Sequence, residues 1–276
     1  MSDHSKDHYK PEEDRAAALN RLRSAASVSI DPELFEKLYL NPPNKVRGDL
    51  RKTFGNPTPI GIGGFLLGAT PLACDLMGWR GAGGNGAASV GAFFFMAGLL
   101  LIISSIFEFL LGNSFSSIVF AVYGGFWLSF AATLTPSFAA YATYAAEPLT
   151  APGEGLATRG FNASFAFWLV FMCMITFIFL ICSVRTNVAF VVLFTSLTLT
   201  FALLAAAFFL NADNITANAS TAGKLVVGGG ACLFVVSLAG WYIFVALMLA
   251  VVDFPIQIPV GDLSSVVRGK SERSRV

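Results

Sequence analysis

The chain has 276 residues, of which 55% are hydrophobic and 13% charged, about half the charged share of an ordinary soluble domain. The net charge is +1, and neither terminal segment is basic enough to indicate nucleic-acid binding. The sequence contains no recognisable nucleophile–base pair and no cofactor-binding loop. The composition argues against a nucleic-acid-binding protein and against an enzyme. It indicates an all-α, polytopic membrane protein.

The few potential metal ligands do not point to a metal site. His4 and His8 lie in the polar N-terminal segment. The four cysteines fall within or at the ends of apolar stretches and lack the spacing of metal ligands: Cys74, Cys173, Cys182 and Cys232. We therefore expect neither a metal nor another cofactor.

A polar leader, residues 1–53, precedes the apolar part of the chain. Within it, Asp31 as a helix cap and Pro32 at the first helical position predict a short helix near 31–40. A second polar segment, the C-terminal tail, occupies residues 254–276. The residues between the two, 54–253, are predicted to form a transmembrane domain.

Six stretches of this domain are long and apolar enough to cross a bilayer, which takes about 20 residues each. The predicted spans are 57–77, 87–111, 115–141, 161–183, 188–210 and 225–252. Very short links follow the second and fourth spans, so spans two and three, and four and five, are expected to be antiparallel neighbours. The remaining links are longer and rich in Gly, Pro, Asn and Thr.

The distribution of basic residues predicts which side the links face. With cytoplasmic termini, the inner side carries ten Lys/Arg in the leader, Arg185 and four in the tail, and the outer side carries three: Arg80, Arg159 and Lys224. The positive-inside bias therefore predicts that both termini are cytoplasmic. The plasma membrane is the expected location. The three glycosylation sequons, at Asn162, Asn214 and Asn218, then all face outside.

The first span begins with an unusual sequence, Asn56-Pro57-Thr58-Pro59, followed by Gly61. Proline is well tolerated in the first turn of a helix, where its missing N–H is not needed. No Lys or Arg lies at mid-span to hold an anion. A helix start offers N–H groups and a partial positive charge, so this segment is a candidate anion-attracting entrance, although prolines there often mark only the start of a helix.

Glu108, near the end of the second span, is the deepest ionisable residue in the predicted spans. Its position about a turn and a half from the link allows an interfacial, solvated carboxylate. Five apolar residues surround it, which equally allows a buried, hydrogen-bonded role. Both interpretations stay open, and a proton relay through Glu108 is a further hypothesis.

Four motifs in order resemble the acetate uptake transporter family, which includes bacterial succinate–acetate permeases, fungal acetate transporters and fungal proteins suspected to export ammonia. The motifs are NPTPIGI from Asn56, Glu108 followed by GNSF at 112–115, YGGFWL at 123–128, and LFTSLTLTFALLA from Leu193. Thr58 departs from the signature, which has a small apolar residue there. The resemblance covers residues 54 to about 253.

The resemblance implies a six-helix protomer, a homohexamer and one pathway through each protomer. The family's pathway narrows at an aromatic–tyrosine–leucine constriction, which corresponds to Phe65, Tyr123 and Leu197. A position linked to substrate selectivity corresponds to Gly240, by a weaker match. The expected function is transport of acetate and other small monocarboxylates, coupled to protons. Ammonia or ammonium export and acetate sensing remain the alternatives.

Overall fold

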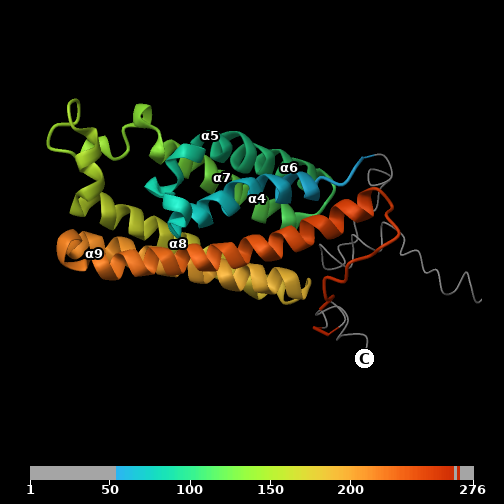
Figure 1. Cartoon of the computed structure of the whole chain (residues 1–276). Helices are drawn as coiled ribbons and strands as arrows, with labels where there is room; N and C mark the ends of the chain where they lie inside the picture. The colour runs from blue at the N-terminus through green and yellow to red at the C-terminus, as the bar shows by residue number, and fades with distance from the viewer. Residues whose placement is uncertain (1–53, 264–265, 268–276) are drawn as a thin grey trace, which may run out of the picture. The chain divides into compact units, whose positions relative to one another are not determined.

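The computed structural model describes residues 54–263 and 266–267, all within one compact unit, Lys37–Val276. In these residues the chain is helical, and its only β-type contact is an isolated bridge between Asn187 and Asp262. The helices are α4 (Thr58–Leu76), α5 (Val90–Ala92), α6 (Leu99–Leu110), α7 (Ser114–Leu134), α8 (Arg159–Ser183) and α9 (Val188–Val251) (Figure 1). The predicted helix near 31–40 lies outside the described residues.

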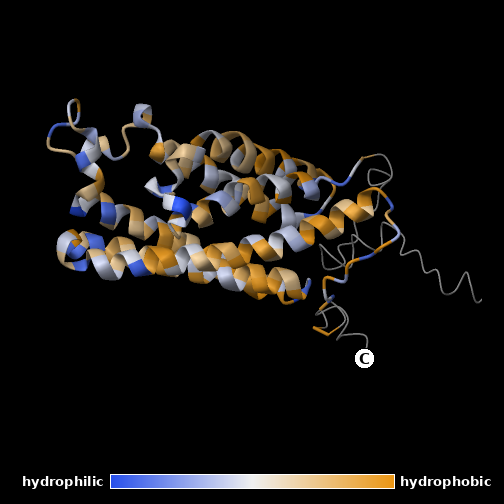
Figure 2. Cartoon of the chain, viewed as in Figure 1, coloured by the Kyte–Doolittle hydropathy of each residue, from blue (hydrophilic) through white to orange (hydrophobic). Residues whose placement is uncertain are grey.

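Five helical segments of the described chain are long and apolar enough to cross a membrane: Thr58–Leu76, Gly84–Leu110, Ser114–Leu134, Arg159–Ser183 and Val188–Val251. Figure 2 shows hydrophobic residues along the length of these helices and hydrophilic ones in the α7–α8 connection and at the bend of α9. The first and fourth agree closely with the predicted spans.

Close packing around α4 explains its glycines. A Cβ added at Gly61 would lie 2.8 Å from Ser104 Oγ on α6, and one at Gly64 would lie 2.6 Å from the Met96 carbonyl oxygen. Only residues without a side chain let two backbones approach this closely. α4 therefore lies directly against the second span.

The second span is not one regular helix. Short 3-10 and α-helical turns lead from Gly84 into a π-helix, Phe93–Gly98, which continues as α6. π-helical turns are rare and often lie at functional sites. This one turns the ring of Phe93 into the core, where it is fully buried against Trp127 with ring centroids 4.9 Å apart.

The predicted antiparallel packing of α6 with α7 is confirmed by a reciprocal pair of hydrogen bonds. The Ser105 hydroxyl donates to the Ser117 carbonyl oxygen at 2.9 Å, and the Ser117 hydroxyl donates to that of Ser105 at 3.0 Å. The prediction that this third span continues to residue 141 was wrong, because α7 ends at Leu134. Thr135 has extended dihedrals, as expected of a residue whose successor, here Pro136, disfavours the helical conformation.

The last two predicted spans form one continuous helical element, α9, interrupted only at Asn214, whose dihedrals (φ −161°, ψ 103°) are extended. The prediction of a loop over 211–224 was therefore wrong. The Asn214 side chain accepts from the Ala217 amide at 2.9 Å and so caps the second leg. Asn218 donates to the Leu210 carbonyl oxygen at 2.8 Å and ties the legs across the bend.

The two legs of α9, residues 188–213 and 215–251, lie side by side (Figure 1). A Cβ added at Gly229 on the second leg would lie 3.0 Å from the Leu204 side chain on the first. Both α8 and α4 pack against α9. α9 thus supplies two of the walls that surround the site described below.

After α9 the chain packs against the turn between α8 and α9. The Val188 amide donates to the Gly261 carbonyl oxygen at 2.8 Å, and the Leu263 amide donates to that of Thr186 at 3.0 Å. Arg185 Nε also donates to the Val267 carbonyl oxygen at 3.1 Å. The start of the predicted tail is therefore bound to the helical domain.

Candidate functional site

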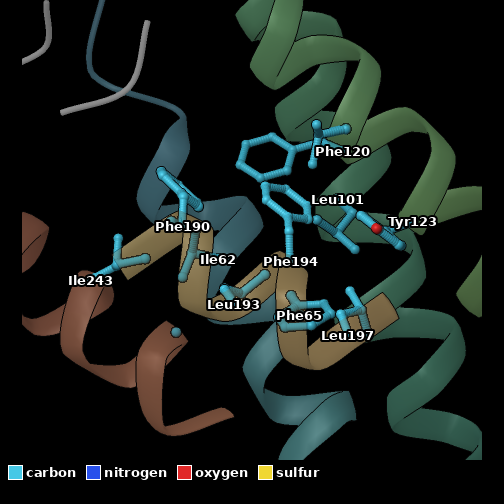
Figure 3. Close-up of a pocket in the computed structure, with 12 residues that line it drawn as sticks. Ile62, Phe65, Leu101, Phe120, Tyr123, Phe190, Leu193, Phe194, Leu197 and Ile243 are labelled. Atoms are coloured by element: carbon cyan, nitrogen blue, oxygen red, sulfur yellow. The ribbon is translucent and has the colours of Figure 1, made fainter. Parts of the chain in front are cut away.

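A small apolar cavity of about 40 Å³ lies between α4, α6, α7 and the two legs of α9 (Figure 3). Phe65, Tyr123 and Leu197, the three residues expected to form a constriction, all line it, and Gly240 does so from the second leg. The Phe65 and Tyr123 ring centroids are 6.4 Å apart. Residues far apart in the sequence thus meet at one point between the helices.

The side chains around the cavity leave little room. Tyr123 and Leu197 are 4% and 3% exposed, and the lining facing the cavity is apolar. A Cβ added at Gly240 would lie 2.7 Å from Leu66 Cδ2, so any larger residue there would make the Leu66 side chain or the second leg of α9 shift. A cavity of this volume holds about one water molecule. A larger solute passes only if the lining moves.

The Tyr123 hydroxyl is hydrogen-bonded to α8, on the side away from the cavity. Its oxygen lies 2.9 Å from Thr176 Oγ1 on α8, and Thr176 in turn donates its hydrogen to the Met172 carbonyl oxygen at 2.7 Å. A threonine hydroxyl has a single hydrogen, so Tyr123 must be the donor in the pair. The aromatic ring, rather than the hydroxyl, therefore faces the cavity.

The start of α4 does not offer the free N–H groups expected of an anion site. The Thr58 amide donates to Asn56 Oδ1 at 2.9 Å, Pro59 has no N–H, and the Ile60 and Gly61 amides point to the Pro57 carbonyl oxygen at 3.1 and 3.4 Å. Asn56 therefore caps the helix itself. The expectation of unpaired backbone donors at this entrance was wrong, because Asn56 before Pro57 pairs the first of these amides, a capping pattern like that of Asp31 before Pro32.

The same helix start is tied to α6 by a buried hydrogen-bond cluster. The Thr58 hydroxyl donates to one carboxyl oxygen of Glu108, and Asn113 Nδ2 donates to the other at 2.6 Å. Ser104 on α6 also donates to the Pro57 carbonyl oxygen at 2.7 Å. Glu108 is 0% exposed, so of its two interpretations the structure shows the buried, hydrogen-bonded one.

Asn56 and Pro57 face a different hollow from the one lined by Phe65. This groove of about 370 Å³ lies between the start of α4 and the end of α6, where Ile60, Phe107 and the residues around them form its apolar wall. The structure therefore divides the predicted site residues into two groups. One surrounds the central cavity and the other secures and borders the start of α4.

A third cavity, of about 200 Å³, was not predicted from the sequence. It lies toward the other end of α4, and its lining includes three asparagines, Asn85, Asn162 and Asn211, among phenylalanine rings of α7, α8 and α9. Asn162 was identified only as a sequon, but it is 2% exposed and donates to the Leu156 and Thr158 carbonyl oxygens, both at 2.8 Å. A glycan on Asn162 is incompatible with this packing.

Comparison with known proteins identifies relatives over most of the chain. The model of the GPR1/FUN34/yaaH family matches residues 40–265. The chain is 44% identical over 251 residues to "Protein alcS" of Aspergillus fumigatus, which covers 91% of each chain. It is 34% identical over 211 residues to "Acetate transporter protein patA" of Aspergillus clavatus, covering 76% of this chain and 79% of that one.

A solved structure has the same fold. The "bacterial acetate channel SatP" superimposes with a TM-score of 0.58 and 23% identity, covering 75% of this chain and 99% of that chain. The order of the four sequence motifs, the meeting of residues from three of them (Ile62, Tyr123 and Leu197) at one cavity, and the match over residues 40–265 all agree. The chain belongs to the GPR1/FUN34/yaaH family.

Proposed function

We propose that this protein transports acetate and other small monocarboxylates across a membrane, through a pathway that passes the central cavity. The observation that carries the proposal is the meeting of Phe65, Tyr123 and Leu197 at that cavity, from three separate helices. Relatives and a structural neighbour that are named as acetate transporters or an acetate channel support the choice of substrate.

The chemistry of the lining fits a small acid. An apolar constriction resists a hydrated ion, because removing its water without replacement hydrogen bonds costs several kcal/mol. A two-carbon acid exposes one methyl group to the rings and presents only one polar group that needs a partner. The central cavity would therefore favour small acids over larger or more highly charged solutes.

The same argument supports proton coupling. The neutral acid crosses an apolar lining at a lower cost than the carboxylate, so a proton entering with each acid lowers the barrier. A proton gradient directed inward would then drive uptake. Glu108 remains a candidate relay because its carboxyl group lies buried beside the start of α4.

We further propose six membrane crossings. A straight helix of 64 residues would be about 96 Å long, three times the hydrocarbon thickness of a bilayer. Each leg of α9, by contrast, is long enough to cross once, and the bend at Asn214 turns the chain back. Six crossings put both termini on one side, and the excess of Lys/Arg there assigns that side to the cytoplasm of a plasma-membrane protein.

Assembly into a homohexamer completes the proposal, on the basis of the family resemblance. The outward faces of the helices carry large apolar side chains, such as Phe95 at 69% and Phe109 at 71% exposed. In a bilayer such faces contact lipid or a neighbouring protomer. Cross-linking of the purified protein in detergent, read as the largest discrete species, measures the number of protomers.

Uptake of labelled acetate into proteoliposomes under an imposed proton gradient tests the function. Leu197→Ala widens the lining, so we expect faster uptake and admission of longer acids. Leu199→Ala is the matched control, because this leucine lies on the same leg and is 51% exposed. Absence of acetate uptake by the wild-type protein would overturn the proposal, as would an identical acid preference for the two variants and wild type.

A further inference from the structure

The indole nitrogen of Trp127, Nε1, is the one buried side-chain polar atom without a hydrogen-bond partner in the described part of the chain. Trp127 is 2% exposed, so bulk water does not reach it. Buried donors are nearly always paired in native proteins, and an unpaired one indicates strain, a missing water or a ligand site. The surroundings of Trp127 favour the last explanation.

The indole packs against rings that line the central cavity and rings that line the larger cavity, although Trp127 itself lines neither. Tyr123, one helical turn earlier on α7, lines the small central cavity, as does Phe65, whose ring centroid is 6.4 Å from that of Trp127. Phe126 and Phe130 line the larger cavity, with ring centroids 5.6 and 6.3 Å from that of Trp127. A path that joined the two cavities would therefore run beside this indole.

The hydrogens of three buried donors near the two cavities, Tyr123, Thr176 and Asn162, are already occupied. The Tyr123 hydrogen is given to Thr176, whose own hydrogen is given to Met172. Asn162, in the larger cavity, gives its amide hydrogens to two backbone carbonyl oxygens and offers only its own carbonyl oxygen inward. Trp127 Nε1–H, beside both cavities, is the one fully buried side-chain donor of the described residues that has no partner.

We propose that Trp127 Nε1–H donates a hydrogen bond to the carboxyl oxygen of the substrate as it leaves the central cavity, when the Phe65 ring shifts aside. The inference rests on the proposed function. It gives the carboxyl group of the substrate a hydrogen-bond donor where the lining of the central cavity is otherwise apolar. An indole N–H donates and never accepts. The position therefore selects a carboxylate or a carbonyl oxygen and offers nothing to an ammonium ion.

A protein that retains Trp127 as its single tryptophan tests this binding directly. The other three, Trp79, Trp168 and Trp241, are replaced by Phe. We expect the fluorescence of Trp127 to show a buried, unbonded indole, and acetate to shift the emission to longer wavelength with saturation, while equal chloride does not. Emission that is already that of a hydrogen-bonded indole without acetate would mean that water fills the site, and would overturn the proposal.

Transport kinetics give a second, independent test. Trp127→Phe removes the donor and keeps an aromatic ring, so we expect KM for acetate to rise about tenfold, as for loss of one hydrogen bond to a carboxylate. Trp168→Phe is the matched control, because Trp168 packs only on rings that line the larger cavity, Phe126 and Phe165, and not on the rings of the central cavity.

The outcomes separate the two proposals. If wild-type protein transports no acetate, the proposed function fails. If the wild-type protein transports acetate but Trp127→Phe and Trp168→Phe have the same KM as wild type, the proposed role of Trp127 is wrong and the proposed function stands. The fluorescence experiment covers the case in which Trp127→Phe does not fold, since that protein keeps Trp127.

Discussion

The hydroxyl of Tyr123 donates to Thr176 Oγ1 across 2.9 Å and thereby joins α7 to α8 behind the central cavity. The bond fixes the tyrosine ring at the constriction without presenting a donor to the pathway. Tyr123 therefore contributes the shape of its ring to the central cavity, while its hydroxyl is used to bind α8.

Tyr123→Phe should therefore affect stability more than transport. Loss of the hydrogen bond should cost about 0.5–1.5 kcal/mol of unfolding free energy, lowering Tm, while acetate uptake stays within a factor of about two because the ring is retained. Thermal unfolding in detergent and uptake in proteoliposomes measure the two effects. Uptake abolished at an unchanged Tm would show instead that the hydroxyl contacts the substrate.

The Thr58 hydroxyl should be a structural clamp on the start of α4. Thr58→Ala leaves one oxygen of buried Glu108 without this donor, which should cost about 1–3 kcal/mol of unfolding free energy. Thr58→Ser keeps the hydroxyl and is expected to unfold near the wild-type Tm. Equal destabilisation by the two substitutions would mean that the lost methyl group, and not the hydrogen bond, matters.

The residues of the central cavity could be named from the sequence only through the family resemblance, which the four motifs in order support. Phe65, Tyr123 and Leu197 were named as a constriction before their positions in space were known, and the structure brings all three together. Pro136 marks the end of α7 in the sequence, but the prediction of this span rested on hydropathy and so extended it to residue 141. Pro136 disfavours the helical conformation of Thr135, so the apolar residues that follow do not extend α7.

Other features left no readable trace in the sequence. Hydropathy measures preference for lipid and not hydrogen-bond geometry, so it could not show that Glu108 accepts from Thr58 on α4 and from Asn113 in the α6–α7 turn. The polar residues around Asn214 are typical of a loop. In the structure these residues are helical on both sides of the bend, and only Asn214 departs from helical dihedrals.

Gly240→Ala should narrow the central cavity. The new Cβ would lie 2.7 Å from Leu66 and push the second leg of α9 away from α4 or into the cavity. We expect slower acetate uptake and a larger loss for longer acids, measured over a series of straight-chain acids. Gly228→Ala is the control, since its Cβ meets Leu203 at an ordinary 3.5 Å. Equal uptake by both variants would place the pathway elsewhere.

Glu108→Gln tests the proton relay. The carboxamide keeps the size of the side chain but neither gains nor loses a proton in the physiological range, so a relay predicts that the rise of acetate uptake with falling pH becomes shallower. Asp75→Asn makes the same chemical change at the half-buried far end of α4, away from the Thr58 cluster, and should keep the wild-type profile. An unaltered profile for Glu108→Gln would leave Glu108 a structural residue.

Cysteine labelling in intact cells should distinguish six membrane crossings from five. In a protein whose four native cysteines are replaced by alanine, Asn214→Cys at the exposed bend of α9 should react with an impermeant maleimide added outside. Arg185→Cys, in the α8–α9 turn, should react only after the cells are permeabilised. If α9 crossed once, a cysteine in the tail after Val267 would react from outside, opposite to the excess of Lys/Arg that assigns the tail to the cytoplasm. Six crossings instead leave that cysteine protected until permeabilisation, because the bend at Asn214 returns the chain to the side on which α9 began.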